Sequence, residues 1–250
     1  MINTTKERTE IPKFIPQIGF LEGDFGEAFF MEFSGRVKSD YNNAYLLNVL
    51  RFDNNIVIGG NPFALVLANQ ILREENLRIP TQADLEKALR TGRDLKGTYE
   101  ETGLVLRSEK DSYSKNTPLA KYIAEQVKER GIRFSPENPV MIPLTGLELE
   151  KADDNGYGLT FRLREDAEIY EAPVLSKQGK FDSKDIDKKT GLPNKVKDSG
   201  SRALYVRDAG LSRLSLYCDL SLLSHGMILD VSGGYGRIVV ISDEATTSKK

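Results

Sequence analysis

The chain has 250 residues, of which 39% are apolar and 29% charged, so it can form one large globular domain or two small ones. Its 35 Lys and Arg residues and 37 Asp and Glu residues leave a net charge of -2, which excludes a surface built throughout to coat nucleic acid or an anionic membrane. A single cysteine, Cys218, and a single histidine, His225, exclude an internal disulfide and a cysteine-based zinc site. Any metal site would rest on carboxylates, which favour Mg, Mn or Ca.

The apolar segments are short. The first residues, MINTTKERTEIPKF, lack the apolar stretch of a signal peptide. The longest apolar run, Phe63 to Ala68, falls far short of the roughly 20 residues that cross a bilayer. We therefore expect a cytoplasmic protein that does not enter a membrane.

The first strands are predicted near the N-terminus. Prolines and a glycine around Phe14–Phe20 favour an extended edge strand, and the aromatic-rich run Glu27–Phe33 favours a second strand. Ala44–Phe52 is interpreted as a third. Asn54–Asn55 is a turn signal, and it predicts an antiparallel hairpin with the strand Ile56–Ile58.

The most hydrophobic part of the chain extends from Asn55 to Leu72. It predicts a short buried strand, a glycine turn and a helix that is apolar nearly all round. Asn61 suits the N-cap of this helix and Pro62 its first position. Because such a helix must be covered on several sides, we expect it between the N-terminal sheet and another layer, either a helix over residues 118–130 or a partner chain.

Two further helices follow. Thr81 and Asp84 have the spacing of a capping box, and Gly92 ends the helix that they begin. A strand is predicted over residues 102–108. The helix over residues 118–130 is the clearest amphipathic one in the chain.

After residue 135 helical periodicity is weak and strand patterns dominate. The predicted strands are Gly146–Lys151, Gly158–Arg164, Glu168–Leu175, 202–206, 211–220, 228–231 and 237–241. An Asn-Gly pair joins the first two as a hairpin, and the last two are predicted to form another around a glycine-rich turn. Residues 176–200 form a long polar loop with seven lysines and four aspartates.

The sequence thus predicts an α+β fold. Residues 1–135 form an α/β portion with about three helices on a small mixed sheet. Residues 136–250 form a mainly antiparallel β portion that includes the long loop, and the two portions can share one core.

The glycine turn is the first candidate site. A strand followed by Gly59, Gly60 and Asn61 at a helix N-terminus can bind a phosphate or another anion through free backbone N–H groups. The turn lacks the spacing of a P-loop, and Pro62 removes one donor. A tight structural turn is the simpler interpretation.

A carboxylate pair is the second candidate. Glu148 and Glu150 share one face of a predicted strand, and with other carboxylates they could hold Mg or Mn for phosphoryl chemistry. A solvated strand face explains them equally well. Apart from this alternative, no cofactor is expected.

The C-terminal strands supply the third candidate, a nucleic-acid surface, because arginines beside aromatic residues on a sheet can bind phosphates and stack on bases. The residues are Arg202, Arg207, Arg213 and Arg237, with Tyr205, Tyr217 and Tyr235. Cys218 and His225 are weighed as a nucleophile–base pair, although a cysteine in an apolar strand is commonly a core residue.

No catalytic residue is assigned from these patterns. The expected function is that of a cytosolic binding or assembly protein that acts through sheet surfaces and the 176–200 loop, with itself as a homo-oligomer or with a protein partner. The alternatives are a metal-dependent enzyme on phosphate-containing substrates, of the nuclease or phosphohydrolase type, and a nucleic-acid-binding protein.

Overall fold

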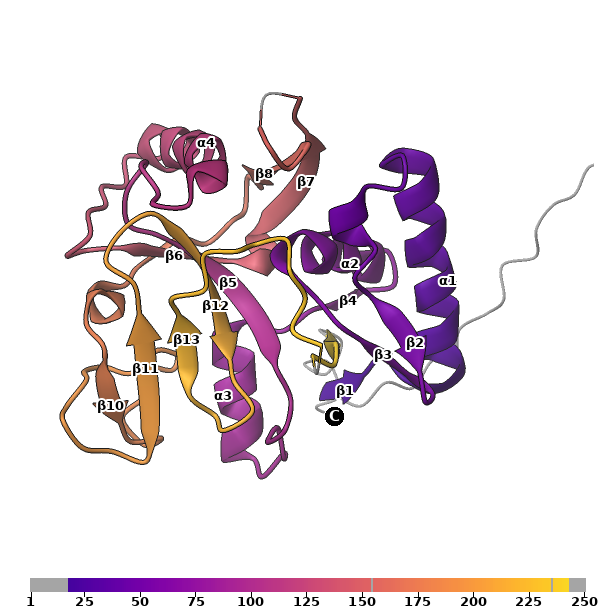
Figure 1. Cartoon of the computed structure of the whole chain (residues 1–250). Helices are drawn as coiled ribbons and strands as arrows, with labels where there is room; N and C mark the ends of the chain where they lie inside the picture. Colours follow the sequence, from indigo (N-terminus) through magenta and orange to yellow (C-terminus); the bar gives the residue numbers. More distant parts are fainter. Residues whose placement is uncertain (1–17, 154, 235, 243–250) are drawn as a thin grey trace, which may run out of the picture.

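The α-helices among the described residues all end before residue 130 (Figure 1). The computed structural model describes residues 18–153, 155–234 and 236–242. The α-helices in these ranges are α1 (Gly23–Asp40), α2 (Pro62–Arg73), α3 (Gln82–Arg90) and α4 (Thr117–Glu129). Short 3-10 helices are η1 (Tyr45–Leu47), η2 (Ser114–Asn116), η3 (Leu144–Gly146) and η4 (Pro173–Ser176).

The strands within the same ranges form one large sheet and three small ones. They are β1 (Ile18–Phe20), β2 (Arg51–Asp53), β3 (Ile56–Ile58), β4 (Leu77–Arg78), β5 (Glu100–Leu106), β6 (Val140–Pro143), β7 (Leu147–Lys151), β8 (Leu159–Leu163), β9 (Tyr170–Glu171), β10 (Gly179–Phe181), β11 (Arg202–Val206), β12 (Leu211–Leu216), β13 (Leu222–Ser224) and β14 (Val239–Ser242). The large sheet has the order β10-β11-β13-β12-β5-β6-β9, and a smaller one the order β1-β14-β4. The pairs β2–β3 and β7–β8 are separate hairpins. Only β11 and β13 pair in parallel in this part of the chain.

Strand β5 lies at the centre of the architecture, between β12 and β6. Its side chains alternate between two hydrophobic clusters, as the pleat of a strand requires. Leu104 and Leu106 pack in one cluster with α2 and α4, whereas Val105 packs in the other with α3. The mixed α+β class is therefore confirmed, and strands from both sides of residue 135 share one sheet.

Local signals in the sequence predicted several element ends correctly. The Asn61 side chain caps α2 by accepting a bond from the Ala64 N–H at 2.8 Å. Thr81 and Asp84 form the predicted capping box of α3. Asn54 and Asn55 both have positive φ, at 49° and 66°, and they join β2 to β3 in the expected antiparallel hairpin.

The strand predicted over Glu27–Phe33 is wrong, because this segment lies inside the 18-residue helix α1. Its buried residues are Gly26, Phe29, Phe33 and Val37, at spacings of three and four. The aromatic residues thus form one stripe of a helix with a 3.6-residue period, and their strand propensity is overridden by packing. With α1 the described chain has four α-helices, one more than the sequence predicted.

Three other strand predictions need correction. Ala44–Phe52 contains the 3-10 helix η1, and only its last residues enter β2. Glu168–Leu175 contains the two-residue strand β9 and then η4, which begins at a proline. The hairpin of residues 228–231 with 237–241 does not form, because β14 pairs instead with β1 on one side and with β4 on the other.

Helix α2 is buried at nearly every position, as its sequence predicted. The cover over Phe63 is the β7–β8 hairpin, whose Phe161 ring stacks on it with centroids 4.5 Å apart. Tyr157, from the turn of the hairpin, lies 5.1 Å from the same ring. The layer over Phe63 is therefore the β7–β8 hairpin and not the helix over residues 118–130.

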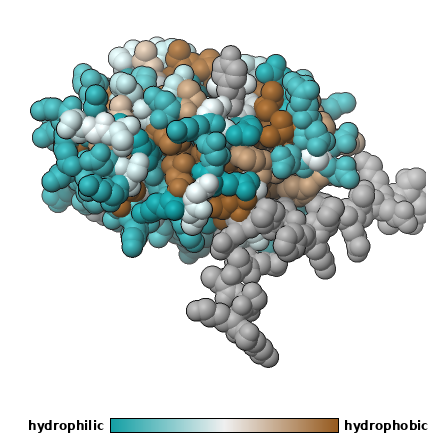
Figure 2. Space-filling model, turned by 90° about the horizontal axis from the view of Figure 1, so that it is seen from below, coloured by the Kyte–Doolittle hydropathy of each residue, from teal (hydrophilic) through white to brown (hydrophobic). Residues whose placement is uncertain are grey.

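The segment 176–200 pairs with the large sheet and packs against its core. It contains β10, which pairs with β11, and it buries Phe181, Ile186 and Leu192 in the cluster around α3. Viewed from below, the surface is largely hydrophilic, with apolar residues in patches near its centre (Figure 2). None of the helices in the described ranges combines the length and apolar character that a bilayer crossing requires.

Candidate functional site

One face of the β5–β12–β13 region carries aromatic and polar side chains. Ser215 of β12 pairs with Glu101 of β5 and with Leu223 of β13, so these three side chains share a face. The neighbouring Leu214 and Leu216 point to the opposite face, into the core. We call the Ser215 side the outer face of the sheet.

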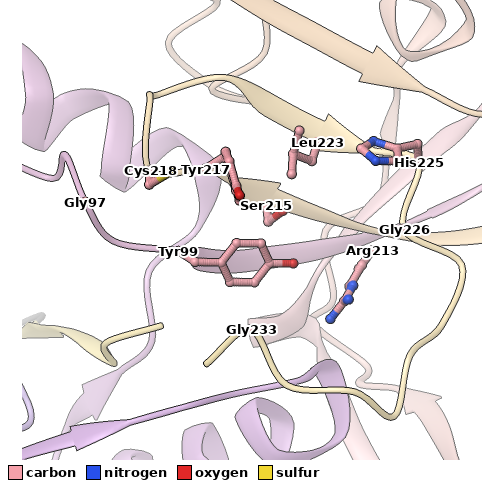
Figure 3. A pocket seen from close by; sticks show the side chains of 10 residues that line it. All are labelled: Gly97, Tyr99, Arg213, Ser215, Tyr217, Cys218, Leu223, His225, Gly226 and Gly233. Atoms are coloured by element: carbon pink, nitrogen blue, oxygen red, sulfur yellow. The ribbon is translucent and has the colours of Figure 1, made fainter. Parts of the chain in front are cut away.

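A cavity of about 540 Å³ opens on this outer face (Figure 3). Its lining is Gly97, Tyr99, Arg213, Ser215, Tyr217, Cys218, Leu223, His225, Gly226 and Gly233. The volume falls within the range of roughly 300–1,000 Å³ that is usual for small-molecule sites. We refer to it as the sheet pocket.

The irregular segment 226–234, which we call the strap, crosses over the sheet pocket. Glycines occur where it comes closest to the lining side chains. A Cβ on Gly233 would lie 2.8 Å from the ring of Tyr99, and a Cβ on Gly226 would lie 3.0 Å from Nε of Arg213. Larger residues at these two positions would push the strap outward and change the shape of the pocket.

The strap is held by side chains from distant parts of the chain. Asn116 donates to the Met227 carbonyl at 2.8 Å, and Arg213 donates to the Val231 carbonyl at 3.0 Å. The strap therefore has a defined position over the sheet.

Two tyrosines form an aromatic corner of the pocket. The rings of Tyr99 and Tyr217 meet edge to face, with centroids 6.1 Å apart and an interplanar angle of 85°. Burial, followed by the nearby Glu101 carboxylate, raises the pKa of Tyr99, so its hydroxyl stays neutral. Such a corner can accommodate a flat apolar group against one ring and the edge of the other.

A buried ion pair supports the polar side of the pocket. Nη1 of Arg213 donates to Oε1 of Glu101 at 2.7 Å. Burial raises the pKa of Glu101 to about 7, although Arg213 opposes this rise. Burial also disfavours the Arg213 guanidinium, but the Glu101 carboxylate and other anionic groups outweigh it and raise the pKa of Arg213.

Two buried polar atoms beside this pair have no hydrogen-bond partner within the described structure. They are Oε2 of Glu101 and Oγ of Ser215; the Tyr99 hydroxyl lies near both side chains and influences them electrostatically, but it makes no well-formed hydrogen bond to either atom. Buried polar atoms are nearly always bonded to protein or water, so an unpaired hydroxyl in the wall of a cavity marks a place where a ligand or water can bind.

The predicted anion site at Gly59, Gly60 and Asn61 is used for internal contacts. The Gly59 N–H donates to the Gly236 carbonyl at 2.8 Å, and the Gly60 N–H donates to Oγ of Ser232 in the strap at 2.9 Å. The Asn61 amide donates to the Leu46 and Asp230 carbonyls. The geometry therefore favours the structural interpretation, in which this turn anchors the strap.

The predicted carboxylate pair lies on the β7–β8 hairpin and is ion-paired there. Arg162 contacts Glu148, and its Nε lies 2.8 Å from Oε1 of Glu150. Tyr122 also donates to Glu150, at 3.1 Å. Across the described ranges, no group of three or more His, Cys, Asp or Glu side chains is placed to hold a metal ion.

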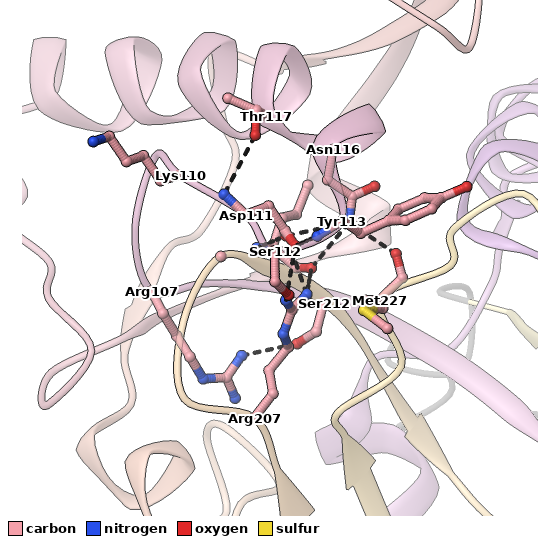
Figure 4. Close-up of polar contacts among 12 residues, drawn as sticks. Arg107, Lys110, Asp111, Ser112, Tyr113, Asn116, Thr117, Arg207, Ser212 and Met227 are labelled. Carbon is pink, nitrogen blue, oxygen red and sulfur yellow. Dashed lines mark hydrogen bonds and ion pairs between the residues drawn. The ribbon is translucent and has the colours of Figure 1, made fainter.

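The predicted nucleic-acid arginines do not form one surface. Arg202 is buried and makes two bonds to Glu86, at 2.7 and 2.8 Å. Arg207 binds Asp111 with Nη1 and Nη2, in a polar network that also includes Asn116 (Figure 4).

The other two arginines lie in different surroundings. Arg237 lies over the ring of Phe20, at 4.2 Å from its centroid. Arg213 alone of the four lines the sheet pocket. Tyr217 lies beside it in the lining, whereas Tyr235 lies outside the described residues.

Cys218 and His225 both line the sheet pocket but lie at opposite ends of the β12–β13 hairpin (Figure 3). The register that pairs Ser215 with Leu223 places Cys218 at the turn and His225 beyond the other end of β13. They are therefore not arranged as a nucleophile and its base.

Sequence reasoning singled out Arg213, Tyr217, Cys218 and His225, but for other chemistry. It missed Tyr99, Glu101 and Ser215. The signal available for Glu101 was a pair of glutamates shortly before the apolar run Leu104–Leu106, since charged residues are rarely buried without a partner. Comparisons with protein-family models, with curated proteins and with solved structures gave no match to this chain.

Proposed function

We propose that this is a binding protein whose ligand occupies the sheet pocket. The observation that carries the proposal is a cavity of small-molecule size with an aromatic corner, an arginine in its wall and an unpaired buried hydroxyl, that of Ser215. This proposal keeps the expectation of binding through a sheet surface. It does not use the 176–200 segment, which contributes no residue to the lining.

The test uses the only histidine and the only cysteine of the chain, both of which line the pocket. The full-length protein is titrated with benzoate, benzamide and benzamidine. Proton NMR follows the imidazole resonances of His225, and a thiol reagent measures the reactivity of Cys218. At least one probe should shift the His225 resonances saturably and slow the modification of Cys218.

Two variants serve as the test and its control. Leu223→Trp places a large ring in the pocket and should abolish both responses, whereas Leu89→Trp, on α3 and outside the lining, should retain them. If no probe binds saturably, or if Leu223→Trp responds like the wild type, the proposal is wrong.

Self-association through the same face is a second candidate. Exposed large hydrophobic residues mark interaction surfaces when they gather in one patch. In the described chain there are seven such residues, and five of them lie between positions 205 and 231, namely Tyr205, Tyr217, Met227, Ile228 and Val231. The last three belong to the strap. We propose that this face joins two copies of the chain in a homo-oligomer.

Light scattering after size exclusion tests this candidate with two matched substitutions. Met227→Glu should lower the measured mass to that of one chain. Met31→Glu changes the same residue type at an exposed position on α1 and should leave the mass unchanged. A wild type of single-chain mass, or equal masses for both variants, would refute it.

The metal-dependent alternative would need Glu148 and Glu150, which are ion-paired with Arg162. The nucleic-acid alternative would need four arginines, three of which are already ion-paired within the protein, namely Arg202, Arg207 and Arg213.

A further inference from the structure

We propose that the ligand of the sheet pocket is a small planar molecule that carries a carboxylate, and that this carboxylate binds the Nε–Nη2 edge of Arg213. The inference rests on the proposed binding function and gives it a ligand class.

Arg213 has hydrogen-bond donors that no described residue uses. A guanidinium carries five N–H donors. Nη1 uses its two, on Glu101 and on the Val231 carbonyl. Nε and Nη2 have no partner among the described residues. These remaining donors lie along one edge of the fork, the arrangement that binds both oxygens of a carboxylate.

A ligand in the pocket can reach Arg213 more easily than Glu101. The Arg213 side chain is 14% exposed and lines the cavity, whereas that of Glu101 is 1% exposed and lies behind it. A cationic ligand would have to reach the buried carboxylate. An anionic ligand meets the guanidinium directly, so the pocket selects negative charge.

The walls of the sheet pocket leave room for a flat ring. Tyr99 and Tyr217 form the aromatic corner, and three lining residues are glycines without side chains. A flat ring can fill this space. Ser215 is placed in the same wall, so its unpaired hydroxyl can donate to a carboxylate oxygen or to a polar ring substituent.

This arrangement couples ligand binding to a proton on Glu101. The ligand would place a second carboxylate on a guanidinium that Glu101 already contacts, so binding favours the protonated form of Glu101. The other titratable groups around this pair are Tyr99, which directly precedes β5, and Asp230 of the strap, which acts on Arg213. His225, at the β13 end of the pocket, also lines the cavity and can contact an anionic ligand.

The direction of the pH effect follows. The pKa of Glu101 is about 7, so below that pH the side chain is largely neutral and the ligand meets no repulsion from it. Above that pH, binding must take up a proton, and the apparent affinity falls by up to about tenfold per pH unit. His225 also lines the pocket, so variants are needed to separate its contribution from that of Glu101.

The experiment compares benzoate, benzamide and benzamidine on the full-length protein by titration calorimetry. At about pH 6 benzoate should bind at least about tenfold more tightly than benzamide, because its bonds to Arg213 are charge-assisted. Benzamidine should bind most weakly. Arg213→Gln should remove the preference for benzoate, and far-UV circular dichroism of each variant verifies that it is folded.

The pH dependence is tested on three neutral substitutions. Between about pH 6 and about pH 8 the wild type should lose several-fold, and at most about tenfold, in benzoate affinity. Glu101→Gln should remove this loss. Glu100→Gln, one residue away on the opposite face of β5, and His225→Gln should both retain it.

Each outcome has one meaning. If benzamide or benzamidine binds more tightly than benzoate and Leu223→Trp still blocks it, the carboxylate proposal is wrong while the binding function stands. If none of the three probes binds, both are wrong. If His225→Gln removes the pH dependence and Glu101→Gln retains it, the coupling to Glu101 is wrong.

Discussion

At the scale of single residues, the interior holds several charged groups, and their hydrogen-bond partners differ in kind. Arg202 and Glu86 form a doubly bonded pair whose side chains are 3% and 2% exposed. Arg107 is fully buried and donates to Oγ of Ser212 (Figure 4) and to Oγ of Ser224, and no carboxylate among the described residues is hydrogen-bonded to it. Burial, together with the nearby Arg207, lowers the pKa of Arg107 to about 10.

The buried pair leads to the first prediction at this scale. Glu86→Ala would leave the Arg202 guanidinium buried without a counter-ion, so it should lower the free energy of unfolding by about 3–5 kcal/mol. Glu109→Ala removes the exposed partner of Lys128 and should cost no more than about 1 kcal/mol. Urea unfolding of both variants measures the difference, and equal costs would contradict the assignment.

A second prediction concerns the adjacent glutamates Glu100 and Glu101. Burial raises the pKa of both above the ordinary 4.5, that of Glu101 to about 7, so the folded state retains protons that the unfolded state has lost. The contribution of these two groups to the free energy of unfolding should therefore be greatest below about pH 4.5. As the pH rises from there to the folded-state pKa of each group, that group should lower the free energy of unfolding by about 1.4 kcal/mol per pH unit.

Thermal melts across this range measure the slope. Glu101→Gln should reduce the slope of stability against pH up to about pH 7, because one of the two titrating groups is then absent. The exposed Glu109 provides a control, because Lys128 holds the pKa of its carboxyl below the ordinary value. Glu109→Gln should leave the decline from acid to neutral pH in place.

At the scale of elements, the best predicted feature is the start of α2. Asn61, Pro62 and the apolar run after them specify a capped, buried helix through contacts a few residues apart. The same reasoning failed for α1, where aromatic residues were interpreted as a strand. Phe29, Phe33 and Val37 recur with the period of a helix, but this pattern distinguishes a helix from a strand only once the surface that they pack against is known.

Asn61 joins α2 to η1, and the energy of this contact can be measured. Asn61→Ala removes the α2 cap and leaves the buried Leu46 carbonyl without its donor, so it should cost about 2–4 kcal/mol. Thr81→Ala removes a cap from α3 alone and should cost about 1 kcal/mol. Equal losses in urea unfolding would show that the second contact of Asn61 contributes nothing.

At the scale of the whole molecule, the large sheet joins the two portions that the sequence separates at residue 135. β5 comes from the first portion, and its neighbours β6 and β12 come from the second. Both hydrophobic clusters contain residues from each side of this position. Neither portion can therefore bury its own apolar surface alone.

This organisation predicts a single cooperative unfolding transition for the full chain. Fragments 1–135 and 136–250 expressed separately should lack cooperative melting. In the first fragment β5 would have neither of its neighbouring strands, and in the second β12 and β6 would lack the strand that lies between them. Circular dichroism of each fragment measures this. A fragment with native-like spectra and a sharp transition would show that it is an independent domain.

The sequence by itself determined the caps of α2 and α3, the Asn54–Asn55 hairpin and the burial of α2, because these depend on residues close together in the chain. Only the tertiary structure decided the sheet pocket. Its central pair, Glu101 and Arg213, is separated by 112 positions, and strand pairing brings the two side chains to one face. Periodicity can show that a strand has two faces, but it cannot show which distant strand will lie beside it.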